Sequence, residues 1–559
     1  MAGLKSVWRL FTRALLLLSI AASFASATGL PADLFDARET TIEGVHTALF
    51  GGLTTCRAVV SAFIARIEEF NPVVNAIITL NPDALSIADS KDVQFASGNA
   101  TAPLFCIPIL LKDNYDAVGM NTTGGSLGLA GSRPTSDSPT TAAFKKAGAI
   151  ILGKANLHEM ALEGLSVSSL GGQTVNPYDH TRTPGGSSGG SGAAIGTSFA
   201  VFATGTDTVN SLRSPASANS LVSFRPTRGL ITRAGVVPNS YTQDTVGAMA
   251  RNLEDLAAAL TVMAGIGYDP NDNHTALTPS DVWGKDYSTY LYGGSLKGLR
   301  IGVLESFFNK TASDETTPVI NVMSDVLSSL ASAGVNLISI NETVYDAATI
   351  SAQLDVQQCE YREVLDAYLS NPALEGDRAK SFNDLYTSGR FLVIPSQYHN
   401  VTSALTHSTS SPSCIAKQLR IANLTATLRA TFASNDLDAI IYPEQRNLVV
   451  KIGSASQSGR NGILAALTGS PVLAIPAGFS PPTAEAPVGV PVGMEILGPP
   501  FSEGRLLNIA RHVGELLGPV RRMPAFANYS VDAREYAGVP VITPSTGNID
   551  AAYPVGRLS

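Results

Sequence analysis

The run Gly185–Gly192 restricts the fold of this chain most, because it holds five glycines and three serines in eight residues. Glycine has no Cβ, so the backbone can turn sharply and approach another group closely. A flexible Gly/Ser linker is one interpretation, but the small apolar segment 193–203 that follows favours a packed helix or strand. A phosphate-binding loop is another, but the Lys-Ser/Thr pair that closes such a loop is missing.

A second glycine segment, 148–155, matches the pattern G-x-x-x-x-G-K, but Ala155 stands where Ser or Thr would hold magnesium. Its interior residues 149–152 form an unbroken apolar run, which predicts a buried strand and not a phosphate loop. We therefore predict no nucleotide site here.

Strand-like and helix-like segments alternate along the chain with short connections, which predicts an α/β layered fold. No linker divides the body, and 44% of the 559 residues are hydrophobic, so a large core can form. The apolar run 104–111 predicts a central strand buried on both faces, with Lys112 at its end. Residues 345–435 are more polar and predict a cap or pocket wall, and the tail beyond 531 is irregular.

The N-terminus predicts export from the cell. Residues 1–27 have a basic start, an apolar run from Ala14 to Phe24 and an A-x-A cleavage site, as in a secretory signal peptide, with an uncleaved anchor as the alternative. Losing Lys5, Arg9 and Arg13 would change the formal net charge from −8 to −11, which disfavours nucleic-acid binding. Eight N-x-S/T sequons fit a eukaryotic secreted glycoprotein, with a fungal source expected: Asn99, Asn121, Asn273, Asn309, Asn341, Asn400, Asn423 and Asn528.

The four cysteines form no C-x-x-C pair, so we expect no zinc site. Cys56 and Cys106 stand in apolar segments and predict buried thiols. Cys359 and Cys414 flank one polar region, where a disulfide between them would suit an oxidising compartment.

Three residues suggest a nucleophilic site. Serine is a weak nucleophile until a base takes its proton, and a lysine can be that base if burial lowers its pKa. Lys112 at the end of an apolar run could reach Ser211 through Ser187, because a hydroxyl both donates and accepts. The alternative is a lysine paired with an acid and two serines in ordinary turns.

The order of several motifs resembles the amidase signature family of serine hydrolases over about residues 40–525. The motifs are Leu111-Lys112-Asp113, Gly185–Ser191, Gly205-Thr206-Asp207, Ser211–Ala216, Asp244–Gly247, Gly469–Phe479 and Gly493–Glu503. The resemblance implies a single large α/β domain with a central mixed β-sheet flanked by helices. Residues 1–27 would then be a signal peptide and 526–559 an irregular C-terminal extension.

The resemblance also implies a role for each matched residue. Ser211 would be the acylated nucleophile, Ser187 the bridging serine after a cis peptide bond, and Lys112 the base that later protonates the leaving amine. Supporting residues would be Ser188, Asp207 and Arg213. The oxyanion hole would consist of the backbone N–H groups of Thr208, Val209, Asn210 and Ser211.

One departure from the family concerns the loop before the nucleophile. Most members have two glycines where this chain has Val209 and Asn210. Backbone donors do not require glycine, but a β-branched residue disfavours left-handed backbone. We therefore expect either a negative φ at Val209 or a rearranged loop.

The sequence thus predicts a secreted amidase that cleaves a small-molecule carboxamide through an acyl-serine, without metal or cofactor. The same site could serve an acyl transferase or esterase, or the fold could be an inactive binding protein. The glutamine-cleaving subunit of the tRNA-dependent amidotransferase also belongs to this family, but a signal peptide disfavours that role. A His-based or metal-based hydrolase lacks its G-x-S-x-G or paired-histidine motif, and His158 is expected to be structural. We expect no stable membrane insertion after signal cleavage.

Overall fold

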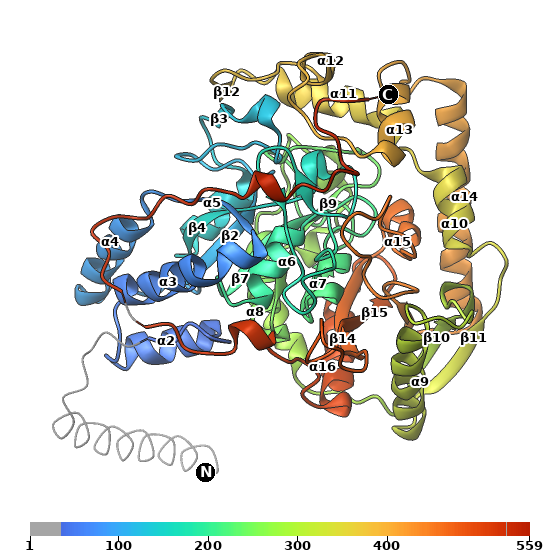
Figure 1. Cartoon of the computed structure of the whole chain (residues 1–559). Coiled ribbons are helices and arrows are strands. Elements are labelled where there is room, and N and C mark those ends of the chain that lie inside the picture. The colour runs from blue at the N-terminus through green and yellow to red at the C-terminus, as the bar shows by residue number, and fades with distance from the viewer. Residues whose placement is uncertain (1–34, 533, 559) are drawn as a thin grey trace, which may run out of the picture.

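A computed structural model describes residues 35–532 and 534–558, so the expected signal segment 1–27 lies outside the described residues. One mixed sheet of eleven strands runs through the molecule in the order β1-β4-β2-β7-β9-β8-β14-β15-β13-β10-β11 (Figure 1). In chain order these strands are β1 (Ile77–Leu80), β2 (Pro108–Lys112), β4 (Ile150–Ala155), β7 (Phe202–Asp207), β8 (Val222–Arg225), β9 (Thr245–Ala250), β10 (Arg300–Leu304), β11 (Asn336–Ile340), β13 (Ala439–Pro443), β14 (Val472–Phe479) and β15 (Pro491–Leu497). The predicted α/β fold with a central mixed sheet is confirmed.

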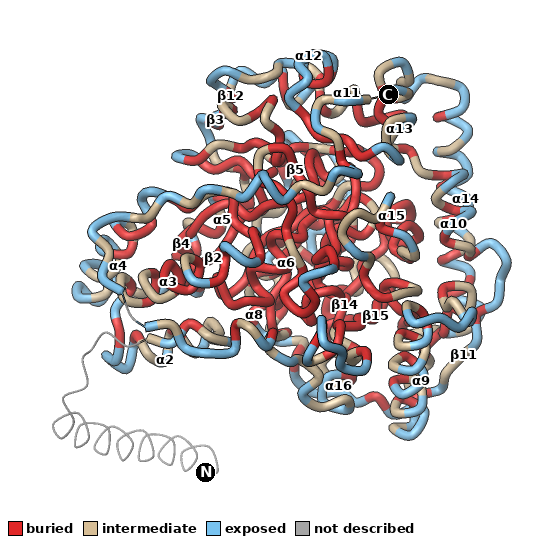
Figure 2. The backbone as a smooth tube through the Cα atoms, in the orientation of Figure 1, coloured by how far each residue is buried: buried red, intermediate tan, exposed pale blue. Residues whose placement is uncertain are grey.

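Helices surround the sheet and bury most of its strands, whereas the edge strand β11 is exposed or half-buried along most of its length (Figure 2). The helices before residue 340 are α2 (Ile42–Phe50), α3 (Cys56–Val74), α4 (Ala84–Ala96), α5 (Pro139–Lys146), α6 (Gly189–Gly196), α7 (Arg213–Ala218), α8 (Leu253–Ala264) and α9 (Thr317–Ser332). After residue 435 come α15 (Ile463–Thr468) and α16 (Glu503–Leu517). The glycine-rich α6 contacts β2, β4, β7 and β9, because helix residues without side chains let it approach the sheet closely.

The placement of β2 determines where the chemistry lies. All five of its residues are buried, and it runs parallel to β4 on one side and to β7 on the other. Parallel neighbours end at the same edge of a sheet. Lys112, the last residue of β2, therefore lies beside the end of β7, where the loop 208–212 leads into α7.

The cap predicted for residues 345–435 consists of five helices. They are α10 (Ala347–Leu354), α11 (Gln357–Leu369), α12 (Phe382–Thr387), α13 (Tyr398–Ala404) and α14 (Pro412–Ser434), at the upper right of Figure 1. A disulfide between Cys359 and Cys414 joins α11 to α14, with a Cα–Cα distance of 5.9 Å, as the sequence allowed.

One cysteine prediction was wrong. Cys56 and Cys106 are not free thiols but a disulfide, with a Cα–Cα distance of 5.5 Å. Cys106 does not lie in a strand: it precedes β2 in a turn with φ +65°, and this turn meets the first residue of α3. Burial alone could not reveal the pair, because a buried thiol and a buried disulfide occupy similarly apolar surroundings.

The C-terminal extension is irregular, as expected, but it packs on the body along its course (Figure 1). The guanidinium of Arg66 donates to the carbonyls of Ala527 and Tyr529, and Asn548 pairs with the backbone of Gln173. Tyr553 is buried. Within residues 35–532 and 534–558, no helix combines the length and apolar character needed to cross a bilayer.

Candidate active site

Lys112 is a fully buried lysine held by hydroxyl groups. Its Nζ lies 2.7 Å from Ser187 Oγ and 2.7 Å from Thr206 Oγ1. Among the described residues, no carboxylate lies within ion-pair distance of this amine, whereas the equally buried Lys154 pairs with Asp113 at 3.5 Å. Burial lowers the pKa of Lys112 to about 7, although Asp207 and Asp244 oppose this shift from a distance. A neutral amine is therefore well populated at physiological pH.

Ser187 lies in the turn that opens α6. The peptide bond between Gly186 and Ser187 is cis, and Ser187 is completely buried. Its carbonyl accepts a hydrogen bond from the backbone N–H of His158 at 3.0 Å. A Cβ on Gly186 would lie 2.5 Å from Ser166 Oγ, so only glycine fits at that position. Ser188 supports the turn through contacts of 3.3 and 3.4 Å with the backbone of Thr206.

Ser211 lies on the loop between β7 and α7 and lines a cavity of about 250 Å³. Among the described residues, its hydroxyl makes no hydrogen bond to Ser187 or to any other group, so the step from Ser211 to Ser187 is not formed in this structure. The backbone N–H groups of residues 208–211 also have no protein acceptor among the described residues. Four successive N–H groups without a protein acceptor can donate to an anion.

A network of buried charges holds this loop. The guanidinium of Arg213 contacts Asp207 at 3.0 and 3.1 Å and Glu495 at 2.9 and 2.8 Å, and it donates to the carbonyl of Val209. Burial by itself would raise the pKa of Asp207, but Arg213 and Arg225 outweigh it and lower that pKa to about 2. The carboxylate of Asp207 also accepts from the backbone N–H of Leu212 at 3.1 Å.

The departure at Val209 and Asn210 does not place strained backbone in the loop. Neither residue has a positive φ, so the first of the two expected alternatives holds. Asn210 is fully buried, and its amide donates to Glu444 Oε1 at 2.9 Å. Thr208 donates to Asp244 Oδ1 at 2.6 Å. The side chains of this loop thus serve as anchors.

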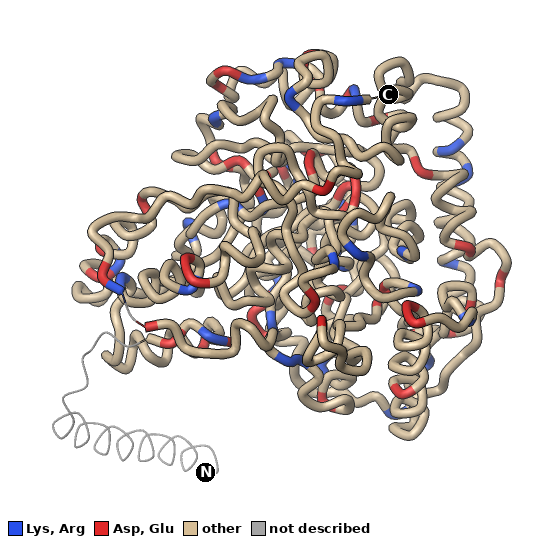
Figure 3. Tube along the Cα trace, viewed as in Figure 1, with Lys and Arg blue, Asp and Glu red and all other residues tan. Residues whose placement is uncertain are grey.

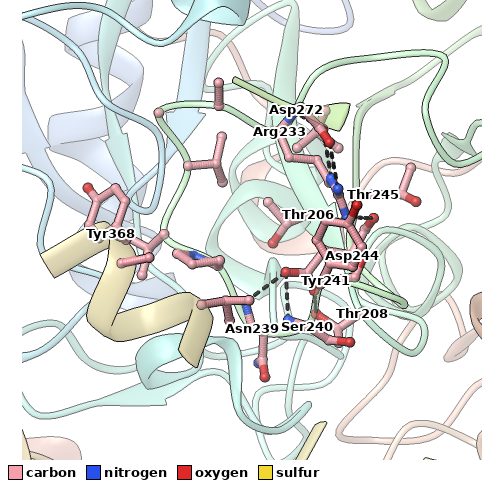
Figure 4. A pocket seen from close by; sticks show the side chains of 18 of the residues that line it. Thr206, Thr208, Arg233, Asn239, Ser240, Tyr241, Asp244, Thr245, Asp272 and Tyr368 are labelled. Atoms are coloured by element: carbon pink, nitrogen blue, oxygen red, sulfur yellow. Dashed lines mark hydrogen bonds and ion pairs between the residues drawn. The ribbon is translucent and has the colours of Figure 1, made fainter. Parts of the chain in front are cut away.

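Two cavities meet beside this loop, since both are lined by Ala161 and Thr208. The cavity at Ser211 is polar and is lined by Glu163, Arg446 and Arg460, among others. The other, of about 280 Å³, is mainly apolar and is lined by the segment 233–241 and α11. In Figure 4, Tyr368 of α11 lies across this second cavity from the Arg233–Asp272 ion pair.

The remaining candidates are structural. His158 is buried, and burial together with Arg460 and Lys112 lowers its pKa to about 3, so it is neutral. The segment 150–155 is the buried strand β4, as predicted. In the described part of the chain, no group of three His, Cys, Asp or Glu side chains could hold a metal ion. Basic and acidic residues are interspersed along the backbone in Figure 3.

Sequence reasoning missed three of the residues that shape this site. Thr206 contacts Lys112, Asp244 anchors Thr208, and Glu444 anchors Asn210. The motifs Gly205-Thr206-Asp207 and Asp244–Gly247 contained the first two, but no pattern assigned them a contact. Glu444 had no motif at all, and its contact spans 234 residues of sequence.

Comparisons with known proteins identify the family of this chain. The Amidase family model matches residues 58–507. One of the subunits of glutamyl-tRNA(Gln) amidotransferase from Alkalilimnicola ehrlichii is 32% identical over 499 residues, which cover 87% of this chain and 99% of that protein. Mandelamide hydrolase of Pseudomonas putida is 30% identical over 83% of this chain and 89% of that protein.

Solved structures give the same result. The native peptide amidase from Stenotrophomonas maltophilia superimposes with a TM-score of 0.74 and 30% identity, covering 88% of this chain and 99% of that chain. The fold and the matched relatives define the class of this protein as an amide-hydrolysing enzyme. This chain belongs to the amidase family, and within it to the amidase signature enzymes.

Proposed function

We propose that this chain is a secreted, glycosylated amidase that hydrolyses the carboxamide of a small molecule through an acyl-Ser211 intermediate. The contact of 2.7 Å between Lys112 Nζ and Ser187 Oγ supports this most directly, because a buried lysine without a carboxylate partner can act as a base. Lys112, Ser187 and Ser211 would be the catalytic residues.

The first half of the reaction forms the acyl-enzyme. Ser211 Oγ attacks the carbonyl carbon, its proton passes to Ser187, and the proton of Ser187 passes to Lys112 Nζ. The backbone N–H groups of residues 208–211 donate to the oxygen that becomes negative in the tetrahedral intermediate. The C–N bond then breaks as protonated Lys112 returns its proton through Ser187 to the leaving nitrogen.

The second half regenerates the enzyme. Water attacks the ester carbonyl of acyl-Ser211, and its proton follows the same path through Ser187 to Lys112. Collapse of the second tetrahedral intermediate breaks the bond to Ser211 Oγ, which takes back a proton, and the carboxylic acid leaves. No step requires a metal or cofactor, and the neutral amine is the active form of Lys112.

The relatives support a small amide as the substrate. One solved structure is called a peptide amidase and one relative a mandelamide hydrolase, so their names indicate amides with a peptide or an aromatic acyl part. The apolar cavity beside Thr206 and Thr208 could hold such a part, with the scissile amide next to Ser211. We expect no nucleic acid among the ligands.

The test is intact-mass analysis after treatment with a serine-reactive fluorophosphonate. We expect one adduct in the wild type and none in Ser211→Ala, Ser187→Ala or Lys112→Met. Ser214→Ala is the matched control, because this buried serine lies on α7 only three residues beyond Ser211. An adduct that persists in a folded Ser211→Ala variant would contradict the assignment of the nucleophile.

A transfer reaction is the second candidate, since relatives that are subunits of glutamyl-tRNA(Gln) amidotransferases align over nearly their full length. An acyl-serine can react with an amine or an alcohol in place of water. Product analysis with and without hydroxylamine separates the two: a hydrolase yields mainly the acid, and a transferase yields acid only when no acceptor is added. An esterase would prefer the matched ester, and an inactive binding protein would not be labelled.

Secretion and glycosylation complete the proposal. Asn99, Asn273, Asn341, Asn400, Asn423 and Asn528 are exposed, and Asn309 is partly exposed, which suits attached glycans. Asn121 is the least suited, because its amide donates to the carbonyl of Ala130 at 2.7 Å and Thr123 is buried. The relatives reported above are bacterial, so the eukaryotic source rests on the sequons and the signal segment.

A further inference from the structure

Glu444 is a buried carboxyl group that reaches the catalytic loop from the far half of the sheet. It follows β13 directly, and its backbone is fixed on both sides: its N–H donates to the carbonyl of Gly493 at 3.1 Å, and its carbonyl accepts from Asn461 at 3.2 Å. The side chain is completely buried, and Oε1 accepts from Asn210 Nδ2 at 2.9 Å. A rigid strand end is thereby tied to the residue that precedes Ser211.

The other contacts that hold the loop do not involve the side-chain amide of Asn210. Arg213 binds the carbonyl of Val209, and the hydroxyl of Thr208 binds Asp244. Gly462 packs on the loop so closely that a Cβ there would lie 2.4 Å from Asn210 Cβ. Among the described residues, Glu444 provides the one side-chain hydrogen bond that Asn210 makes.

We propose that Glu444 is a positioning residue of the oxyanion loop, which acts through Asn210 to aim the four free N–H groups of residues 208–211 at the reacting carbonyl oxygen. The inference rests on the proposed function. Donors in an oxyanion hole work because they are already oriented before charge develops. A side-chain anchor on residue 210 supplies that orientation where a glycine would supply none.

The charge state of Glu444 gives this role a signature. Burial and the nearby Glu495 raise its pKa far above the ordinary value of a glutamic acid, and Asp207 adds to this effect. Arg213 opposes it, but that guanidinium is already paired with Asp207 and Glu495. Tyr442, the remaining titratable group that faces it, stays neutral because burial raises its pKa well above 10. Glu444 therefore carries its proton at neutral pH.

Ionisation of Glu444 would oppose catalysis. A negative charge one hydrogen bond away from the loop would disfavour the negative oxygen of the tetrahedral intermediate. We therefore expect the rate to fall on the alkaline side of the optimum, while Lys112 controls the acid side.

Two substitutions at one position test this. Glu444→Gln keeps the acceptor for Asn210 but cannot ionise, so we expect near wild-type activity at pH 7 and no alkaline decline. Glu444→Ala removes the anchor, and we expect kcat to fall about 10- to 100-fold with KM within about threefold, as for a modest misplacement of catalytic groups. Asn210→Ala should match Glu444→Ala, and the double variant should lose no more than either single variant.

The matched control is Glu503→Gln. Glu503 is another buried glutamic acid with a raised pKa, but it binds the backbone N–H of Thr227 at 2.8 Å, away from the catalytic loop. This variant should keep the alkaline decline. An alkaline decline that survives in Glu444→Gln, or wild-type kcat in a folded Glu444→Ala, would overturn the inference.

Labelling of Ser211 by the fluorophosphonate separates this inference from the proposed function. A wild type that is labelled, together with a Glu444→Ala variant that is labelled more slowly, supports both. Equal labelling rates refute the role of Glu444 alone. A folded wild type that is never labelled refutes the proposed function, and the positioning role falls with it. If Glu444→Ala does not fold, the presence or absence of the alkaline decline in Glu444→Gln still tests the role of Glu444.

Discussion

The acid side of the pH profile tests the catalytic base most sharply. Lys112 is fully buried and contacts two hydroxyl groups at 2.7 Å, and its pKa is lowered to about 7. If the neutral amine is the base, the rate follows the unprotonated fraction, which is about one half at pH 7, about one tenth at pH 6 and about one hundredth at pH 5. Between pH 8 and pH 5 we therefore expect a loss of about 100-fold.

The rate constant for fluorophosphonate labelling of Ser211 measures this without a known substrate, and kcat/KM repeats it once an amide is found. Each sample is returned to pH 7.5 afterwards, where recovery of the full rate shows that the loss came from titration and not from unfolding. Because the neutral amine is required, the rate must rise with pH; a rate that falls from pH 5 to pH 7 would have the wrong sign.

Glu159 provides the control for this profile. It lies just after β4, and burial raises its pKa to about 7, so it titrates in the same range as Lys112. Glu159→Gln should keep the acid limb if Lys112 is the base. A labelling rate that stays flat between pH 8 and pH 5, or a limb that disappears in Glu159→Gln, would refute the reasoning.

Three further predictions concern the buried charges around Asp207, the disulfide of the cap and the attached glycans. The pKa of Asp207, lowered from 3.8 to about 2, corresponds to about 2 kcal/mol of stability at neutral pH, which is present above pH 4 and lost as the pH falls through about 2. Asp207→Asn also leaves two buried arginines short of a partner, so urea unfolding should show a loss of about 3–5 kcal/mol, and an unchanged midpoint would contradict the network. Replacing both Cys359 and Cys414 by serine removes the bridge that closes a loop of 55 residues. We expect this double variant to lose about 2–4 kcal/mol of stability in thermal unfolding and to have a raised KM, because the bridge holds the cap. A double variant with unchanged stability and unchanged KM would argue against the bridge. Enzymatic deglycosylation followed by peptide mapping should find glycans at the six exposed sequons and none at Asn121, so a modified Asn121 would be the contrary result.

Much of the fold could be predicted because its signals are local. The apolar run 149–152 predicts a buried strand and most of it lies in β4, and the apolar run 104–111 contains most of β2, because a continuous apolar run is a local signal. The helices α2 and α4 were missed. Helix α4 has only three buried residues in thirteen, so its sequence shows little amphipathic pattern.

The residues of the site also divide into those with a local sequence signal and those that only tertiary contacts reveal. Lys112 at the end of an apolar run, the Gly/Ser turn around Ser187 and the loop at Ser211 are short motifs, and their chemistry can be inferred from residue type and order. The family resemblance rests on those motifs, and the family model agrees with it. The sequence alone therefore suffices to identify the candidate base, bridge and nucleophile.

Tertiary structure decided what depends on contact and burial. The amino-acid sequence by itself determined the α/β fold, the family and the candidate triad, because these follow from periodicity and from local motifs. Only the folded chain brought Cys106 to Cys56 and Glu444 to Asn210, across 50 and 234 residues of sequence. The lowered pKa of Lys112 is likewise tertiary, because segments distant in sequence together bury its amine.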